Sequence, residues 1–179
     1  MLMKETTGLI VVDIQGKLAR IIHDSDSLIA NCQKLIKGAQ LLDIPIVYLE
    51  QNPDKLGSTV DELSELLSEY TPIQKYSFNA CSEPSFIDTL NYHNVDSWLV
   101  CGIEAHICVY QTATGLSERG YKVQVVSDCI ASRDVANKQL ALTRLQQNNI
   151  AVTGLEMCLY ELINDCRSPE FKDILALIR

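Results

Sequence analysis

Residues 8–15 read GLIVVDIQ, and this segment indicates the class of fold. Its four consecutive apolar residues include three that are β-branched, a run typical of a strand buried on both faces. The run ends at Asp13, a carboxylate that is costly to bury unless it is paired or lies at the mouth of a sheet. On this pattern alone, Asp13 is a helix cap, a hydrogen-bonding loop residue or a catalytic group.

Further apolar runs follow along the chain and alternate with helical patterns. They predict strands at residues 45–49, 98–101, 123–126 and 150–152. Helical periodicity covers residues 28–42, 60–70, 84–90, 106–118 and 134–147, and two more helices finish the chain. This alternation implies a parallel sheet with helices on both faces, formed by a single domain over residues 1–179.

Boundary signals mark several of these helices. Thr59 and Glu62 have the spacing of a capping box, Pro84 suits the first turn of a helix, and Gly120 suits the end of one. Residues 51–58 and 71–82 lack periodicity, so we expect two irregular loops there, the second containing Lys75.

The composition is that of an ordinary globular protein and argues against several classes of partner. Hydrophobic residues make up 47% of the 179 residues, and the net charge of −8 predicts no basic surface for nucleic acid or for an anionic membrane. No apolar stretch approaches the roughly 20 residues of a membrane span. The seven cysteines include no CxxC pair, and several lie in apolar runs, which predicts reduced thiols in a cytoplasmic protein.

Ligands of parallel sheets bind beyond the carboxyl ends of the strands, which directs attention to Asp13, Glu50, Asp128 and the segment after Gly102. Cys108 lies near the start of a predicted helix, where free N–H groups and positive potential would favour a thiolate. Local features alone nevertheless favour a buried structural cysteine, and Lys75 alone reads as a solvated surface charge.

Three blocks of the sequence together resemble a known family. Residues 8–15 (GLIVVDIQ), 75–78 (KYSF) and 102–109 (GIEAHICV) are similar to the three blocks of the isochorismatase-like cysteine hydrolases, which include nicotinamidases, N-carbamoylsarcosine amidohydrolase and isochorismatases. The similarity continues through residues 111–128 and 153–162, and GIEAHICV is most similar in wording to the isochorismatase-domain-containing proteins. The resemblance implies a three-layer α/β/α Rossmann-like fold with a parallel six-stranded sheet.

The resemblance also implies a catalytic triad of Asp13, Lys75 and Cys108. It places a cis peptide bond between Ile103 and Glu104, and an oxyanion hole formed by the N–H groups of Glu104 and Cys108. In such a site Asp13 accepts the thiol proton, Lys75 stabilises the carboxylate and the thiolate, and the thiolate attacks a carbonyl carbon.

Two departures from these relatives narrow the chemistry. Metal-binding nicotinamidases use an Asp-x-His pair and a further histidine, whereas this chain has His23 and then no histidine until His93. We therefore expect no metal and no other cofactor. Isochorismatases cleave a vinyl ether and can work without the cysteine, so the presence of Cys108 favours acyl chemistry.

The two irregular loops are expected to supply the substrate contacts, with Gln51, Tyr76 and Phe78 lining the pocket and His106 at its mouth. Aromatic and amide side chains without arginine suit a small amide or ureido compound better than dianionic isochorismate. Vinyl-ether hydrolysis and a non-catalytic binding or scaffold role are the alternatives. The resemblance further implies a homo-oligomer, which a local apolar patch would allow on an acidic surface.

The remaining polar candidates have weaker support as catalytic groups. His106 lies two residues before Cys108, and residues so spaced on a helix do not face each other, which argues against a Cys–His dyad. We expect His93 at a helix end and Asp128 in a loop-bracing role, while Glu104 either faces the pocket or holds the turn. Residues 8–16 contain no GxGxxG motif, so a dinucleotide site is not predicted.

Overall fold

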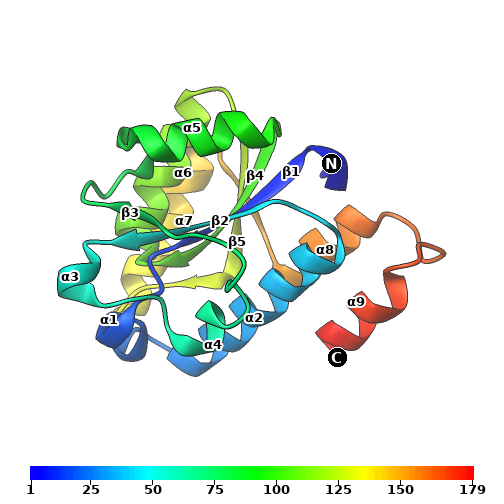
Figure 1. Ribbon diagram of the computed structural model, residues 1–179, viewed down its shortest axis with the longest axis horizontal. Helices are drawn as coiled ribbons and strands as arrows, with labels where there is room; N and C mark the ends of the chain where they lie inside the picture. Colours follow the sequence, from blue (N-terminus) through cyan, green and yellow to red (C-terminus); the bar gives the residue numbers. More distant parts are fainter.

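The computed structural model describes all residues from 1 to 179 and is built around a parallel six-stranded sheet (Figure 1). The strand order is β3-β2-β1-β4-β5-β6, with β1 and β4 at the centre. The strands are β1 (Thr7–Val12), β2 (Ile46–Gln51), β3 (Ile73–Lys75), β4 (Ser97–Ile103), β5 (Lys122–Ala131) and β6 (Ala151–Thr153). The predicted fold class and number of strands are therefore confirmed.

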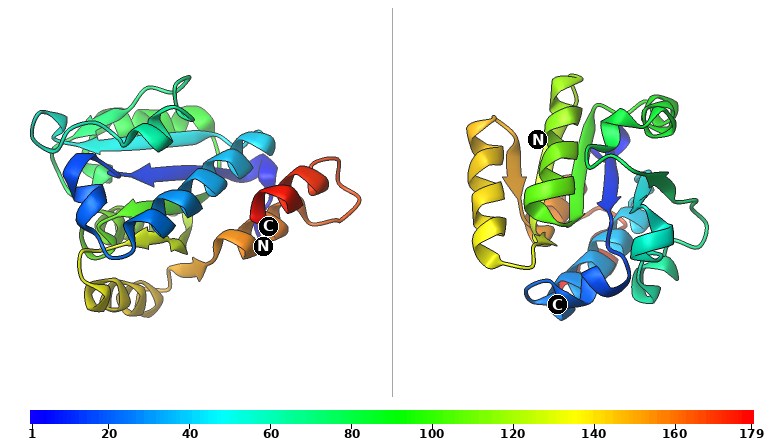
Figure 2. Two further views of the ribbon diagram at one scale, coloured as in Figure 1. Left: turned by 90° about the horizontal axis from the view of Figure 1, so that it is seen from below. Right: turned by 90° about the vertical axis from the view of Figure 1, so that its left-hand side faces the viewer.

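Helices cover both faces of the sheet, as the two rotated views show (Figure 2). One face carries α2 (Ser25–Leu41), α8 (Leu155–Ile163) and α9 (Phe171–Ile178). The other carries α5 (Pro84–His93), α6 (Tyr110–Glu118) and α7 (Val135–Gln147). Shorter turns of helix are η1 (Lys4–Thr6), α1 (Gly16–Ile21), α3 (Pro53–Leu56), α4 (Asp61–Ser64), η2 (Ala80–Ser82) and η3 (Ala105–Val109). None of these helices combines the length and apolarity needed to cross a bilayer.

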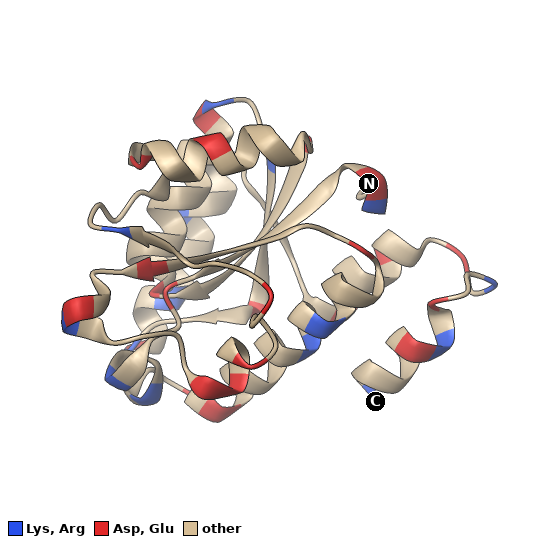
Figure 3. Ribbon diagram, in the orientation of Figure 1, with Lys and Arg blue, Asp and Glu red and all other residues tan.

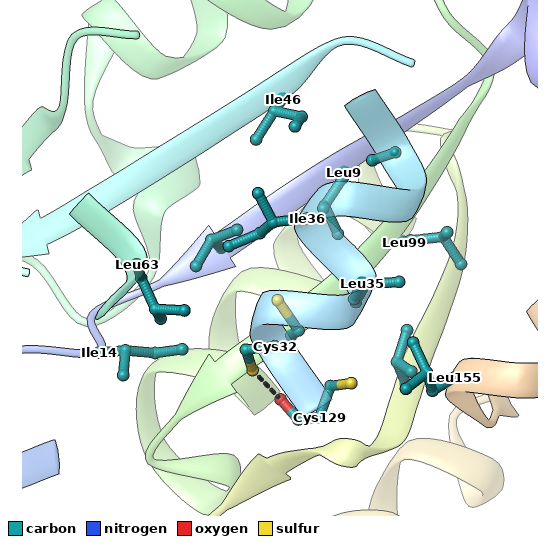
Figure 4. Close-up of a cluster of buried hydrophobic side chains, with 14 of the residues drawn as sticks. Leu9, Ile14, Cys32, Leu35, Ile36, Ile46, Leu63, Leu99, Cys129 and Leu155 are labelled. Atoms are coloured by element: carbon teal, nitrogen blue, oxygen red, sulfur yellow. Dashed lines mark hydrogen bonds between the residues drawn. The ribbon is translucent and has the colours of Figure 1, made fainter. Parts of the chain in front are cut away.

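The pleat of β1 divides the apolar core into two clusters. Leu9 and Val11 join the cluster under α2 and α8, whereas Ile10 and Val12 join the cluster under α5, α6 and α7. Figure 4 shows the first cluster, in which the side chains of α2 pack against those of β1, β4 and α8. Because both faces of β1 are buried, its sequence has no polar alternation.

The structure corrects three local predictions around residues 59–75. Thr59 and Glu62 do not form a capping box, because the Thr59 hydroxyl donates to Glu50 Oε1 and the Glu62 carboxylate pairs with Arg20. The helix expected over residues 60–70 is reduced to α4 (Asp61–Ser64). The segment predicted to be an irregular loop contains β3, and Lys75 is its last residue.

The backbones of the central strands β1 and β4 lie close together at Gly102, near the end of β4. Its φ is +125°, and a Cβ there would lie 2.0 Å from the carbonyl oxygen of Val12 on β1. We expect Gly102→Ala to lower the free energy of unfolding by about 2–3 kcal/mol, because backbone strain adds to a steric clash. Gly120, at φ +88° with open space around it, is the matched control, and Gly120→Ala should cost only about 1 kcal/mol. Equal losses for both variants in urea unfolding would contradict this account of Gly102.

Candidate active site

The register of the sheet gathers polar residues at the carboxyl edge of its central strands. Val12 on β1 is the partner of both Leu49 on β2 and Gly102 on β4, so the residues that follow them start at one level. On the other side of β2, Gln51 and Lys75 are register partners. The strand order reverses at β1 and β4, and ligands of open α/β sheets bind in the crevice at such a point.

Lys75 and Asp13 form a buried ion pair at this edge. Lys75 Nζ lies 2.7 Å from Asp13 Oδ2, and the two side chains are 0% and 2% exposed. Lys75 also donates to Gln51 Oε1 at 2.6 Å and to the carbonyl oxygen of Ser77 at 3.2 Å. The interpretation of Lys75 as a surface charge, which its sequence surroundings alone favour, is therefore wrong.

The other carboxylate oxygen of Asp13 has no partner. Oδ1 is buried and receives no hydrogen bond, although a buried acceptor normally has one. Burial raises the pKa of Asp13 above the usual value of a carboxyl group, against the opposing effect of Lys75. The site thus holds a carboxylate with one oxygen paired and one oxygen free.

Cys108 shares a cavity with Asp13. It lies in η3, a π-helical turn that leads into α6, where the sequence predicted one continuous α-helix. Burial, and next the negative charge of Asp13, raise the pKa of the Cys108 thiol to about 12. We expected the start of a helix to favour a thiolate, and this expectation is wrong because desolvation and the carboxylate outweigh it. At neutral pH the resting residue is a thiol, which needs a base in order to react.

The shared cavity has a volume of about 150 Å³. Gln51 and Phe78, which the sequence analysis expects in the pocket lining, are among its lining residues, together with Ile103 and Glu104. Tyr76 and His106 are not among the residues that line it. Tyr76 is largely exposed, and His106 Nδ1 lies 3.0 Å from Ser132 Oγ. The lining residues are Asp13, Leu18, Gln51, Leu56, Phe78, Ile103, Glu104, Ile107 and Cys108.

The peptide bond between Ile103 and Glu104 is cis. The Glu104 side chain is buried and accepts from the backbone N–H of Arg133 at 2.9 Å and from Arg133 Nε at 3.0 Å. These bonds connect the segment after β4 to the segment after β5. Glu104 therefore both faces the cavity and braces the turn, which the sequence left as alternatives.

Two buried polar residues hold the second wall of the cavity: Gln15, which sequence reasoning missed, and Glu50, which its place after a strand singles out. Gln15 Nε2 donates to the carbonyl oxygen of Gly57 at 2.6 Å, and Glu50 Oε1 accepts from the Thr59 backbone N–H at 2.7 Å. Together they fix the segment that contains Leu56, a lining residue. Gln15 lies within the first sequence block, but its partners are more than 35 residues away in the sequence. No local sequence pattern therefore indicated its role.

Residues outside the cavity follow the simpler sequence predictions. His93 is the last residue of α5, and Asp128 Oδ1 accepts from the Leu155 backbone N–H at 2.8 Å at the start of α8. No group of three or more histidine, cysteine, aspartate or glutamate side chains is placed to hold a metal ion.

Comparison with known proteins assigns the family. The family model described as Isochorismatase domain matches residues 7–157. The chain belongs to the isochorismatase family. Isochorismatase domain-containing protein 2 of Danio rerio is 33% identical over 171 residues, which cover 95% of this chain and 85% of that protein. The secreted isochorismatase effector Isc1 of Phytophthora sojae is 33% identical over 183 residues, which cover 99% and 87%.

Solved structures share the fold of this chain. A structure named MAR1 ribonuclease from Caenorhabditis elegans is 36% identical, with a TM-score of 0.93, and the match covers 99% of this chain and 91% of that one. The YcaC gene product of Escherichia coli, described as an octameric hydrolase of unknown specificity, is 20% identical with a TM-score of 0.89 and coverage of 98% and 94%. At that identity the second likeness concerns the fold. The chain is an isochorismatase-family hydrolase, as its sequence blocks predicted.

Proposed function

We propose that this protein hydrolyses a small, uncharged amide or ureido-type carbonyl compound through a thioester on Cys108. The observation that carries the proposal is the unpaired Oδ1 of buried Asp13, in the same cavity as a thiol whose pKa is raised to about 12. A free carboxylate oxygen beside a neutral thiol is the arrangement that general-base activation of a nucleophile requires.

The proposed reaction has two steps. Asp13 Oδ1 takes the thiol proton while the sulfur attacks the carbonyl carbon, and the N–H groups of Glu104 and Cys108 hold the oxyanion. The carbon–nitrogen bond then breaks, and Asp13 returns the proton to the departing amine. In the second step Asp13 takes a proton from water, the hydroxide attacks the thioester, and the thiol of Cys108 forms again. Lys75 keeps Asp13 ionised throughout, and no metal or cofactor enters either step.

The lining of the cavity supports an uncharged substrate. It contains two carboxylates, Asp13 and Glu104, and no lysine, arginine or histidine. Its other residues are mostly apolar, and about 150 Å³ holds the equivalent of about five water molecules. A dianion such as isochorismate would meet negative charge there without a cation to pair with.

The same reasoning applies to RNA, which the name of the C. elegans structure raises as a second candidate. The chain has a net charge of −8, and Figure 3 shows acidic and basic residues interspersed rather than basic residues gathered over one element. A polyanion needs a basic surface for binding. The proposal therefore includes no nucleic acid as a partner, and RNA is one of the substrates in its test.

A turnover screen tests the proposed substrate class. The purified protein is assayed against short amides, ureido compounds, esters, isochorismate and RNA, with Cys108→Ala as the control. We expect turnover of an uncharged amide or ureido compound that disappears in Cys108→Ala. Robust isochorismate turnover that survives Cys108→Ala would support the vinyl-ether alternative, cleavage of RNA would support the nuclease alternative, and silence on every substrate would support a scaffold role.

The pH dependence of turnover tests the role of Asp13. Because Asp13 must be ionised to accept a proton, kcat/KM should fall on the acid side as pH drops through its pKa. Burial raises that pKa, so the loss should occur at a higher pH than the value of about 3.9 for an exposed aspartate. An acid limb at or below that value would contradict Asp13 as the base.

Assembly and compartment belong to the same proposal. The likeness to an octameric protein supports a homo-oligomer, and a light-scattering mass near the 20.0 kDa of one chain at micromolar concentration would contradict it. All seven cysteines are free, six of them buried, which supports a reducing compartment such as the cytoplasm.

A further inference from the structure

The N–H groups of the Lys75 ammonium donate hydrogen bonds to acceptors inside the protein. A lysine ammonium has three N–H groups, and Lys75 Nζ has three acceptors: Asp13 Oδ2 at 2.7 Å, Gln51 Oε1 at 2.6 Å and the Ser77 carbonyl oxygen at 3.2 Å. Because the side chain is fully buried, solvent supplies no further partner. Each N–H group of Lys75 therefore has an acceptor within the protein.

Gln51 is fixed at both ends of its amide. Its Oε1 faces the ammonium, which can only donate, and its Nε2 donates to the Tyr76 carbonyl oxygen at 2.7 Å. The orientation of the amide is thus set by its partners, since a flipped amide would place two donors together. The backbone is held as well, because the Gln51 N–H donates to Gln15 Oε1 at 2.7 Å.

Gln51 Oε1 accepts a hydrogen bond from Lys75, and this bond determines which oxygen of Asp13 stays without a partner. Without Gln51 Oε1, one buried N–H of Lys75 would lose its acceptor, and a buried donor without a partner is costly. The neighbouring unpaired acceptor is Asp13 Oδ1. A lysine that donated to both oxygens of Asp13 would weaken each of them as an acceptor for the thiol proton.

The geometry points to Gln51 as a positioning residue that holds Lys75 on Asp13 Oδ2 and thereby keeps Oδ1 available to Cys108. This inference rests on the proposed function, in which Asp13 is the base. The Gln51 amide is uncharged, so it accepts a hydrogen bond from Lys75 without adding a negative charge near Asp13. A carboxylate in its place would also accept from Lys75, but it would raise the pKa of Asp13 by repulsion.

Acetylation of Cys108 by p-nitrophenyl acetate provides the test, followed by release of p-nitrophenolate in a single turnover and by mapping the acetyl group with mass spectrometry. In this step the sulfur–carbon bond forms, the bond to p-nitrophenolate breaks and the thiol proton moves to Asp13. Gln51→Met keeps the length of the side chain and removes the acceptor. We expect it to slow acetylation at pH 7 by about 10²-fold, the contribution of a well-placed base.

The rate of acetylation should fall as the pH drops through the pKa of Asp13, which gives its pH profile an acid limb. The two variants of Gln51 should shift this acid limb in opposite directions. In Gln51→Met, Lys75 pairs with both oxygens of Asp13, so the limb should shift to lower pH. Gln51→Glu keeps an acceptor for Lys75, so it should retain most of the rate while its added charge shifts the limb to higher pH. Gln74→Met, the same change at an exposed glutamine on β3 outside the cavity, is the matched control and should leave the limb in place.

These outcomes separate Gln51 from the rest of the proposal. If both Gln51 variants keep the wild-type acid limb, as Gln74→Met should, Gln51 is only a wall of the cavity and the inference is overturned. Should Gln51→Met fail to fold, the limb of Gln51→Glu decides alone. Failure of wild-type Cys108 to become acetylated would instead contradict the proposed function itself.

Discussion

Cys108→Ala is expected to reduce turnover of the best amide or ureido substrate by about 10⁴-fold or more. The substitution removes the atom that forms the bond to the carbonyl carbon, and loss of a nucleophile from a cooperating set of catalytic groups has effects of this size. The cavity should still bind the substrate, because its apolar walls remain. The measurement is kcat under saturating substrate, together with a binding assay on the inactive variant.

Another buried cysteine supplies the control for this substitution. Cys101 lies in the core on β4, fully buried and outside the cavity, so Cys101→Ala should lower stability without removing turnover. Comparable turnover losses in the two variants, at matched folded fractions, would show that the effect of Cys108→Ala is structural.

Lys75→Met is expected to lower the free energy of unfolding at pH 8 by about 3–5 kcal/mol, because it leaves the Asp13 carboxylate buried without its cation. The loss should also depend on pH. Removal of Lys75 raises the pKa of Asp13 further, so Asp13 becomes protonated as pH falls and the penalty should then shrink. Urea unfolding of the variant and the wild type at pH 8 and pH 5 measures both effects.

Two further variants separate the buried charge from other effects of losing Lys75. The double variant Asp13→Asn with Lys75→Met removes both charges and should recover most of the stability while remaining inactive. Lys17→Met removes an exposed lysine and should change stability by less than about 0.5 kcal/mol. A destabilisation of Lys75→Met that is the same at both pH values would contradict the buried ion pair as its cause.

Much of the fold was predictable because its main signals are local. The apolar run of β1 and the helical stripe of α2 appear directly in the sequence, and strand–helix alternation then leaves a parallel sheet as the natural arrangement. Asp13 and the segment leading to Cys108 follow the ends of central strands, so their meeting at one edge was also predictable.

The features that were missed depend on contacts between distant segments. β3 has only three residues at the edge of the sheet, including exposed Gln74, so nothing local distinguished it from a loop. Thr59 and Glu62 have the spacing of a capping box, but their partners, Glu50 and Arg20, come from other elements. The raised pKa of Cys108 likewise comes from burial and from Asp13, neither of which its own helix encodes.

Trapping the intermediate tests the central claim most directly. The enzyme is quenched in acid during turnover of its best substrate, digested, and analysed by mass spectrometry for an acyl group that hydroxylamine removes. The proposed function predicts this acyl group on the peptide that contains Cys108 in the wild type and its absence from Cys108→Ala. Full turnover in Cys108→Ala, with no acyl group on Cys108 in the wild type, would contradict it.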